Sequence, residues 1–128
     1  MTCPYCGKEA EFVDSKTYYK NGKSYGMIYL CRPCDALVGA HKGSDLPLGT
    51  LANGYLRSMR IQTHKVIDPI WESKYMTRDA VYALLAKKMS LEQDKCHIGM
   101  FNVAQCQEAM EKMKIENWKA ISAERWRP

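Results

Sequence analysis

The spacing of apolar positions along the chain changes near residue 50. Before it, apolar and aromatic residues occur in short runs bounded by glycine and polar residues, the clearest being Tyr25–Leu30. After it, apolar positions recur every three or four residues, the period of helices that bury one face. Seven of the eight glycines and three of the five prolines also lie in residues 1–54. We therefore predict an α+β fold, a turn-rich β module followed by about three helices.

Three short strands are predicted in the β module. The first arm of a hairpin covers Glu11–Ser15 and Thr17–Lys20, and Asn21-Gly22 is a typical two-residue hairpin turn. The second arm is the run Tyr25–Leu30, which ends at Cys31. Residues 36–40 are predicted to form the third strand.

The helical part has recognisable start signals. Thr50 is the expected N-cap of the first helix, Thr77 caps the second, and Asn102 with Gln105 forms a capping box for the third, which is expected to begin at Val103 and run toward Trp118. The apolar stripe of the first helix consists of Ala52, Tyr55, Leu56, Met59, Val66, Ile67 and Ile70. We expect residues 46–128 to form one compact unit with the β module.

Four cysteines form two Cys-x-x-Cys pairs, Cys3 with Cys6 and Cys31 with Cys34, separated by 24 residues. A two-residue gap lets both sulfurs of one turn reach one ion, and two such turns supply the tetrahedral four-thiolate shell that Zn²⁺ favours. The predicted hairpin would bring the two turns together. We therefore predict a zinc ribbon in residues 1–45, with one structural zinc ion per chain and no open position for an activated water.

Other interpretations of the cysteines remain. A Cys-x-x-Cys pair can also be a redox site, although such pairs normally lie at a helix N-terminus and these flank predicted strands. Cys106 falls on the apolar stripe of the third helix and is expected to be a buried thiol. Cys96, His97 and His41 are the alternative for a second metal site.

The net charge is +5, and residues 46–90 contain seven basic and three acidic side chains. Four thiolates around one Zn²⁺ would lower the charge by about 2 and make the β module slightly acidic. The predicted phosphate-binding ridge therefore lies on the helices and consists of Arg57, Arg60, His64 and Lys65, with Lys87 and Lys88 nearby. The alternative is a solvated face, and we expect Arg57→Glu plus Arg60→Glu to test the ridge without unfolding the chain.

Aromatic and basic residues alternate near the C-terminus. Trp118, Arg125 and Trp126 give this tail an amphipathic character. The tail either docks on the protein's own core or anchors a partner, because tryptophan and arginine are enriched in binding hot spots.

The sequence disfavours membrane and catalytic functions. Its apolar runs are far shorter than the roughly 20 residues of a membrane span, and no leader opens the chain, so we expect a cytoplasmic protein. We find no nucleotide-binding loop, nucleophile elbow or convincing pair of carboxylates beside a histidine. We therefore expect no enzyme, and the residues to examine for an unexpected one are Asp45, Asp68 and Glu72 beside His41 or His97.

Several motifs of this sequence resemble those of a family, the small zinc-finger-containing proteins of phages and prophages. They are Cys-Pro-x-Cys-Gly at residues 3–7, Ser-Tyr-Gly-Met-Ile-Tyr-Leu-Cys at 24–31, His-Lys-Gly at 41–43, Pro-Leu-Gly-Thr-Leu-Ala at 47–52 and Cys-His-Ile-Gly-Met-Phe at 96–101. The resemblance extends to about Met113 and implies a zinc site and a mobile-element origin.

By analogy with zinc-containing anti-CRISPR proteins, we expect this chain to bind and inhibit a host machine, for which a Cas9-type nuclease is the best single candidate. The partner would then be a protein, a host nuclease or nucleic-acid-processing complex. The alternative is a nucleic-acid-binding regulator that contacts phosphates through the basic helices of residues 57–88.

Overall fold

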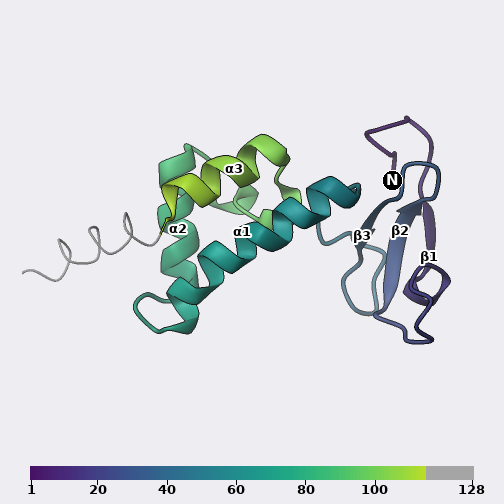
Figure 1. Ribbon diagram of the computed structural model, residues 1–128, viewed down its shortest axis with the longest axis horizontal. Coiled ribbons are helices and arrows are strands. Elements are labelled where there is room, and N and C mark those ends of the chain that lie inside the picture. The colour runs from purple at the N-terminus through teal and green to yellow at the C-terminus, as the bar shows by residue number, and fades with distance from the viewer. Residues whose placement is uncertain (115–128) are drawn as a thin grey trace, which may run out of the picture. The chain divides into compact units, whose positions relative to one another are not determined.

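The computed structural model describes residues 1–114 and divides the chain into two compact units, Met1–Arg57 and Ser58–Pro128. The first unit contains a three-stranded sheet, and the helices follow it (Figure 1). This confirms the predicted α+β fold. The division falls within helix α1, Gly54–Glu72, and therefore later in the chain than the predicted boundary at residue 45.

The sheet is antiparallel, with strand order β1-β2-β3. Its strands are β1 (Glu11–Asp14), β2 (Met27–Cys31) and β3 (Ala36–Gly39). Side chains on successive residues of a strand point to opposite faces, so the two faces bury different sets of residues. One buried cluster contains Cys3, Ala10, Cys31, Ala36, Val38 and Leu51, and the other contains Ile28, Leu30 and Leu37.

The connection from β1 to β2 differs from the predicted tight hairpin. The predicted strand Thr17–Lys20 is wrong, because a 3₁₀-helix, Ser15–Thr17, follows β1 directly. The Asp14 carboxylate accepts a hydrogen bond from the Lys16 amide at 2.9 Å, which starts this turn. The buried Ser15 hydroxyl then accepts from the Tyr25 amide at 2.6 Å and closes a wide loop. The local bond of Asp14 and the longer-range bond of Ser15 to the backbone thus win over strand propensity.

Helix α1 begins at Gly54, and the predicted cap at Thr50 is wrong. The side chain of Asn53 accepts a hydrogen bond from the Leu56 amide at 3.0 Å, whereas the backbone of Ala52 still pairs with Leu37. Tyr55, expected in the apolar stripe, is 62% exposed. The buried residues of α1 are Leu56, Met59, Arg60, Thr63, Ile67 and Ile70. In the described part of the chain, no helix is both long and apolar enough to cross a bilayer.

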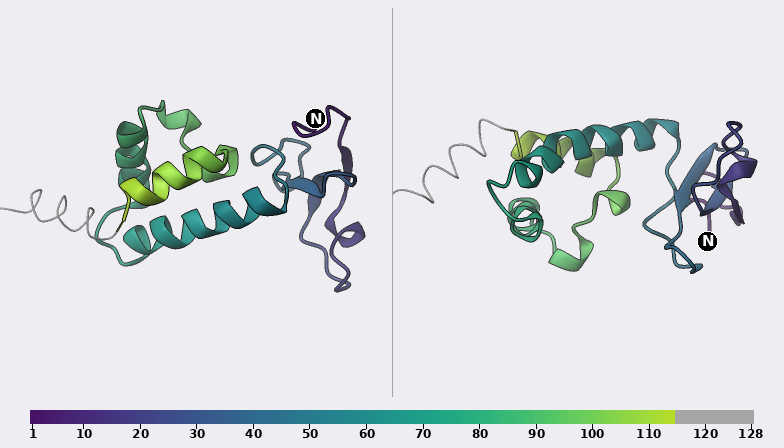
Figure 2. Two further views of the ribbon diagram at one scale, coloured as in Figure 1. Left: turned by 45° about the horizontal axis from the view of Figure 1, so that its top comes forward. Right: turned by 90° about the horizontal axis from the view of Figure 1, so that it is seen from below.

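The second unit contains the rest of α1 together with α2 (Arg78–Met89) and α3 (Val103–Lys112). Helix α3 lies beside the segment of α1 that follows Arg57 (Figures 1 and 2). Both predicted caps are confirmed: Thr77 accepts from the Ala80 amide, and Asn102 and Gln105 form a reciprocal capping box. Helix α3 ends at Lys112, earlier than expected, and Trp118 lies outside the described residues.

The capping box of α3 provides a first prediction. Asn102→Ala removes the side-chain oxygen that accepts from the Gln105 amide at 2.8 Å. We expect a loss of about 1 kcal/mol in the free energy of unfolding. Asn102→Asp is the matched control because it keeps an accepting oxygen. Urea unfolding of both variants checks this, and equal stability of wild type and Asn102→Ala would contradict it.

Candidate zinc centre

The four cysteines of the two Cys-x-x-Cys pairs occupy one end of the sheet. Cys31 ends β2, and Cys34 lies in the turn that leads to β3. The N-terminal segment folds back on itself, since the Cys3 amide donates to the Lys8 carbonyl at 2.8 Å and the Ala10 amide donates to the Met1 carbonyl at 2.8 Å. Antiparallel pairing of β1 with β2 then brings this folded segment next to Cys31.

The arrangement of the sulfur atoms fits a zinc ion. All four lie within 4.8 Å of one another, and the Cys6 and Cys31 sulfurs are 3.6 Å apart. Tetrahedral zinc with Zn–S bonds near 2.3 Å requires sulfur separations of about 3.8 Å. Among residues 1–114, these cysteines are the one group of three or more Cys, His, Asp or Glu side chains gathered closely enough to hold a metal. The four cysteines hold one structural zinc ion.

The two Cys-x-x-Cys turns share an unusual backbone conformation at the residue after the second cysteine. Each turn is followed by a residue with positive φ, Gly7 at 77° and Asp35 at 50°. The Gly7 amide donates to the Cys3 carbonyl at 2.9 Å, and the Asp35 amide donates to the Arg32 carbonyl at 3.2 Å. These turns direct backbone N–H groups toward the sulfurs and so stabilise negative charge on them.

The negative charge that the four cysteine sulfurs acquire on ionisation favours a bound cation. Burial opposes ionisation of Cys3, but hydrogen bonds from the backbone of Tyr5 and Cys6 outweigh it and lower the pKa of this thiol to about 7. Burial and the neighbouring sulfurs raise the pKa of Cys34 to about 12. Four thiolates therefore repel one another until Zn²⁺ compensates them. Zinc binding must release protons, so zinc affinity falls as the pH falls.

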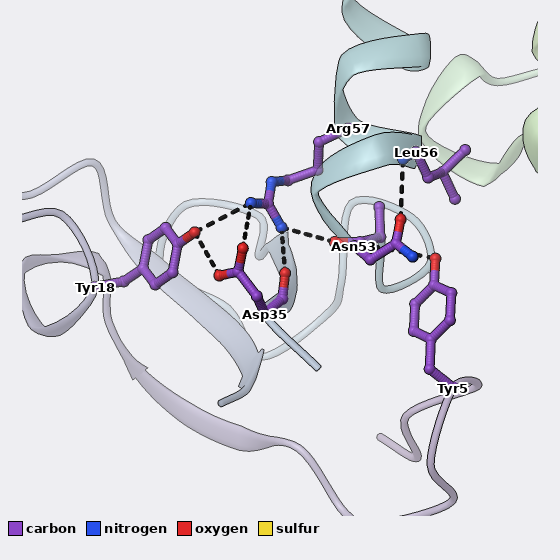
Figure 3. Close-up of polar contacts among 7 residues, drawn as sticks. Tyr5, Tyr18, Asp35, Asn53, Leu56 and Arg57 are labelled. Carbon is purple, nitrogen blue, oxygen red and sulfur yellow. Dashed lines mark hydrogen bonds and ion pairs between the residues drawn. The ribbon is translucent and has the colours of Figure 1, made fainter. Parts of the chain in front are cut away.

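Two contacts join the cysteine turns to the start of α1 (Figure 3). Tyr5, between the first two cysteines, accepts a hydrogen bond on its hydroxyl from the Asn53 amide at 3.1 Å. The Arg57 guanidinium donates to the Asp35 carbonyl at 2.6 Å and lies 3.3 Å from its carboxylate. Tyr18 donates to the same carboxylate at 2.6 Å. The first turn of α1 thus belongs to the zinc-containing unit.

Sequence reasoning missed Tyr5, Tyr18 and Asp35 as supports of the zinc centre. Their partners lie 48, 17 and 22 residues away in the chain. The sequence offered one weak signal, the position of Tyr5 and Asp35 within or directly after a Cys-x-x-Cys pair.

The predicted basic ridge is not a ridge of exposed cations, and this expectation is corrected. Arg57 makes the contacts just described and also donates to the Ala52 carbonyl at 2.9 Å. Arg60 is only 9% exposed, and its Nε and Nη2 atoms donate to the Phe101 carbonyl at 3.0 and 2.9 Å. Both arginines thus bond to backbone carbonyls of their own unit, and the Phe101 carbonyl is buried and needs such a donor.

The other predicted surface residues are scattered. The Nδ1 atom of His64 lies 3.2 Å from a carboxylate oxygen of Asp68, and Lys65 is exposed beside His64. Lys87 is exposed, and Lys88 is half-buried at the end of α2. Trp118, Arg125 and Trp126 lie outside the described residues.

The residues of the alternative second metal site are in different units. His41 belongs to the first unit, whereas Cys96 and His97 belong to the second. Cys96 is buried, which raises the pKa of its thiol, and His97 is exposed. Cys106 is fully buried, as its place on the apolar stripe predicted.

Comparison with known proteins agrees with this centre. No curated protein and no solved structure matches the chain. A family described as a zinc-finger-containing domain matches residues 1–116, which include the four cysteines and all three helices. The chain therefore belongs to this family of zinc-finger-containing domains, and the cluster of four cysteines agrees with that description.

Proposed function

We propose that this protein is a non-enzymatic zinc-finger protein that binds nucleic acid through its zinc-containing unit. One observation carries the proposal: lysines that form no ion pair within residues 1–114 gather at the end of the sheet that lies away from the zinc ligands. These lysines are Lys20 and Lys23 in the β1–β2 connection and Lys42 after β3. Both segments lie at the sheet end opposite the N-terminal segment (Figure 1).

The chemistry of the zinc centre supports a binding role. Four protein sulfurs complete the tetrahedral shell, so the ion has no position at which to activate water or polarise a substrate. The zinc instead holds the two cysteine turns together, and with them the strands and the start of α1. The recognition chemistry then falls to side chains on the surface of this unit.

The ion pairs of the first unit leave its distal lysines unneutralised. Glu9 pairs with the N-terminal amine, Glu11 with Arg32 at 2.7 Å, and Asp35 with Arg57 at 3.3 Å. None of the ion pairs formed within residues 1–114 involves Lys20, Lys23 or Lys42. The β1–β2 connection, residues 15–26, contains three lysines and no acidic residue.

The negative charge of the zinc centre does not cancel these lysines. Cys31 ends β2, and the lysine-bearing connection enters β2 at Met27. At about 3.3 Å per residue, the two ends of β2 are roughly 13 Å apart. This exceeds the screening length of about 8 Å at physiological ionic strength. The unit is therefore polarised, which the sum of charges over residues 1–45 concealed. At its distal end Lys16, Lys20, Lys23 and Lys42 outnumber the two carboxylates of Asp14 and Asp45.

Salt dependence tests the proposal. Three phosphate contacts give a slope of about −2 in log K against log salt for a single strand, and about −2.7 for a duplex. We expect the affinity for a fluorescein-labelled oligonucleotide to fall about 20- to 40-fold between 50 and 200 mM salt. Fluorescence anisotropy measures this affinity. For a single strand, Lys20→Gln plus Lys23→Gln should reduce the magnitude of the slope by about 1.4.

Lys8→Gln is the matched control, because Lys8 is exposed near the zinc ligands rather than at the distal end. It should leave the slope close to that of the wild type. If neither a single strand nor a duplex binds at 50 mM salt, the proposed function is wrong.

The helical surface of residues 57–88 is the weaker candidate for phosphate contact, since Arg57 and Arg60 are engaged within the fold. Inhibition of a Cas9-type nuclease stays a prediction that rests on analogy. Capture from a host lysate with and without nuclease distinguishes it, because a protein inhibitor keeps its partner after nuclease digestion.

A further inference from the structure

We infer that the nucleic acid bound by this unit is single-stranded and that its bases stack on aromatic side chains at a cavity beside the distal end of the sheet. The inference rests on the proposed function and specifies both the form of the nucleic acid and the surface. It assigns a site to residues that the zinc centre does not use.

The cavity lies within the first unit and has a volume of about 630 Å³. One wall is formed by Phe12 of β1 together with Tyr25 and Met27 at the entry to β2. The facing wall is the segment after β3, which contributes His41 and Lys42. A cavity of this size is within the range that takes a small ligand. Its walls combine aromatic, apolar and basic groups with one carboxylate, that of Asp45.

The aromatic rings at this cavity are exposed, although burying them would be energetically favourable. Tyr25 is 63% exposed and Phe12 is 41% exposed. Leaving such rings in water forgoes the free energy that burial of aromatic surface supplies. Exposed aromatic surface next to a cavity therefore indicates a partner with a flat apolar face.

The rings are also held in place before any partner arrives. The Asn21 amide nitrogen donates to the Tyr25 hydroxyl at 3.0 Å, and the edge of Tyr19 meets the Tyr25 ring at a centroid distance of 5.4 Å. Phe12 packs against Tyr29 with centroids 4.9 Å apart. A base that stacks on Tyr25 or Phe12 thus orders little additional protein, which lowers the entropic cost of binding.

Lysines lie next to these rings in the chain. Lys20 follows Tyr19, and Lys23 is two residues before Tyr25, while Lys42 belongs to the facing wall. Alternating rings and cations match a strand in which bases alternate with phosphates. A duplex has its bases stacked inside and offers no base faces to the rings, whereas a single strand offers both groups. The combination therefore favours a single strand over a duplex.

The experiment measures anisotropy of labelled 12-nucleotide probes, oligothymidine, oligouridine and a duplex of the same length, at 50 mM salt. We expect at least one single strand to bind about tenfold more tightly than the duplex. Tyr25→Ala should weaken single-strand binding about tenfold, the effect of losing one stacked base. Tyr25→Phe keeps the ring and should bind within about twofold of the wild type.

Tyr55→Ala is the matched control, since Tyr55 is 62% exposed in the same unit but does not line the cavity. It should leave the affinity unchanged, and zinc content and circular dichroism should be equal in all variants. Equal binding of duplex and single strand that Tyr25→Ala does not change would overturn the inference and leave the proposed function standing. Absence of binding to all three probes would overturn both.

Discussion

Cys31→Ser is expected to abolish zinc binding and to unfold the unit Met1–Arg57. Cys31 is 4% exposed and ends β2, so its loss breaks the tetrahedral shell that holds the two cysteine turns together. Structural zinc contributes about 10–16 kcal/mol at neutral pH in zinc-finger peptides. A unit of this size buries too little apolar surface to replace such a contribution. The contacts of Tyr5 and Asp35 with the start of α1 should be lost with it.

Elemental analysis and circular dichroism check this expectation. Wild type should contain one zinc per chain, and Cys31→Ser should contain none and lose strand signal. Cys106→Ala is the matched control, because it removes a fully buried thiol from the second unit and should keep one zinc per chain. The assignment of the centre fails if freshly prepared wild type contains no zinc or if Cys31→Ser retains it.

Arg60→Met is expected to destabilise the second unit by about 2–3 kcal/mol. The guanidinium donates twice to the Phe101 carbonyl, and both groups are buried. Methionine fills much of the same space but cannot donate, so this carbonyl loses both of these hydrogen bonds. The carbonyl belongs to the residue just before the Asn102 capping box, and the start of α3 should loosen with it.

Thermal unfolding measures the effect, and a loss of this size lowers Tm by roughly 10–20 °C in a unit of under 100 residues. Lys65→Gln is the control on the same helix, since Lys65 is exposed and should change stability by less than about 0.5 kcal/mol. An unchanged Tm for Arg60→Met would contradict the structural role of Arg60.

The same contacts change the expected outcome of Arg57→Glu plus Arg60→Glu. The sequence presented these residues as surface cations whose replacement would leave the fold intact. Arg57 holds Asp35 beside the zinc ligands, and Arg60 holds Phe101, so each replacement would bury or misplace a negative charge. We now expect the double variant to unfold, and substitutions at Lys20 and Lys23 are the better test of phosphate binding.

Local patterns determined the parts of this protein that depend on neighbouring residues. The two-residue gap in each Cys-x-x-Cys pair sufficed to identify the zinc ligands, because both sulfurs of one turn face the same ion. The caps at Thr77 and Asn102 and the burial of Cys106 followed from spacing within one or two helical turns. The signals for these features lie within a few residues of one another, although the sheet must still bring the two cysteine pairs together.

Tertiary structure decided which polar side chains support the fold and which remain at the surface. Arg57 and Arg60 are one helical turn apart and look alike in sequence, yet their partners lie 22 and 41 residues away. The wide loop after β1 likewise depends on the bond between Ser15 and Tyr25. The fold also places Lys20, Lys23 and Lys42 at the sheet end away from the zinc. The summed charge of residues 1–45 had instead suggested that this module binds phosphate poorly. A periodic pattern gives the face of a helix, but only the folded chain determines which buried carbonyl or carboxylate meets that face.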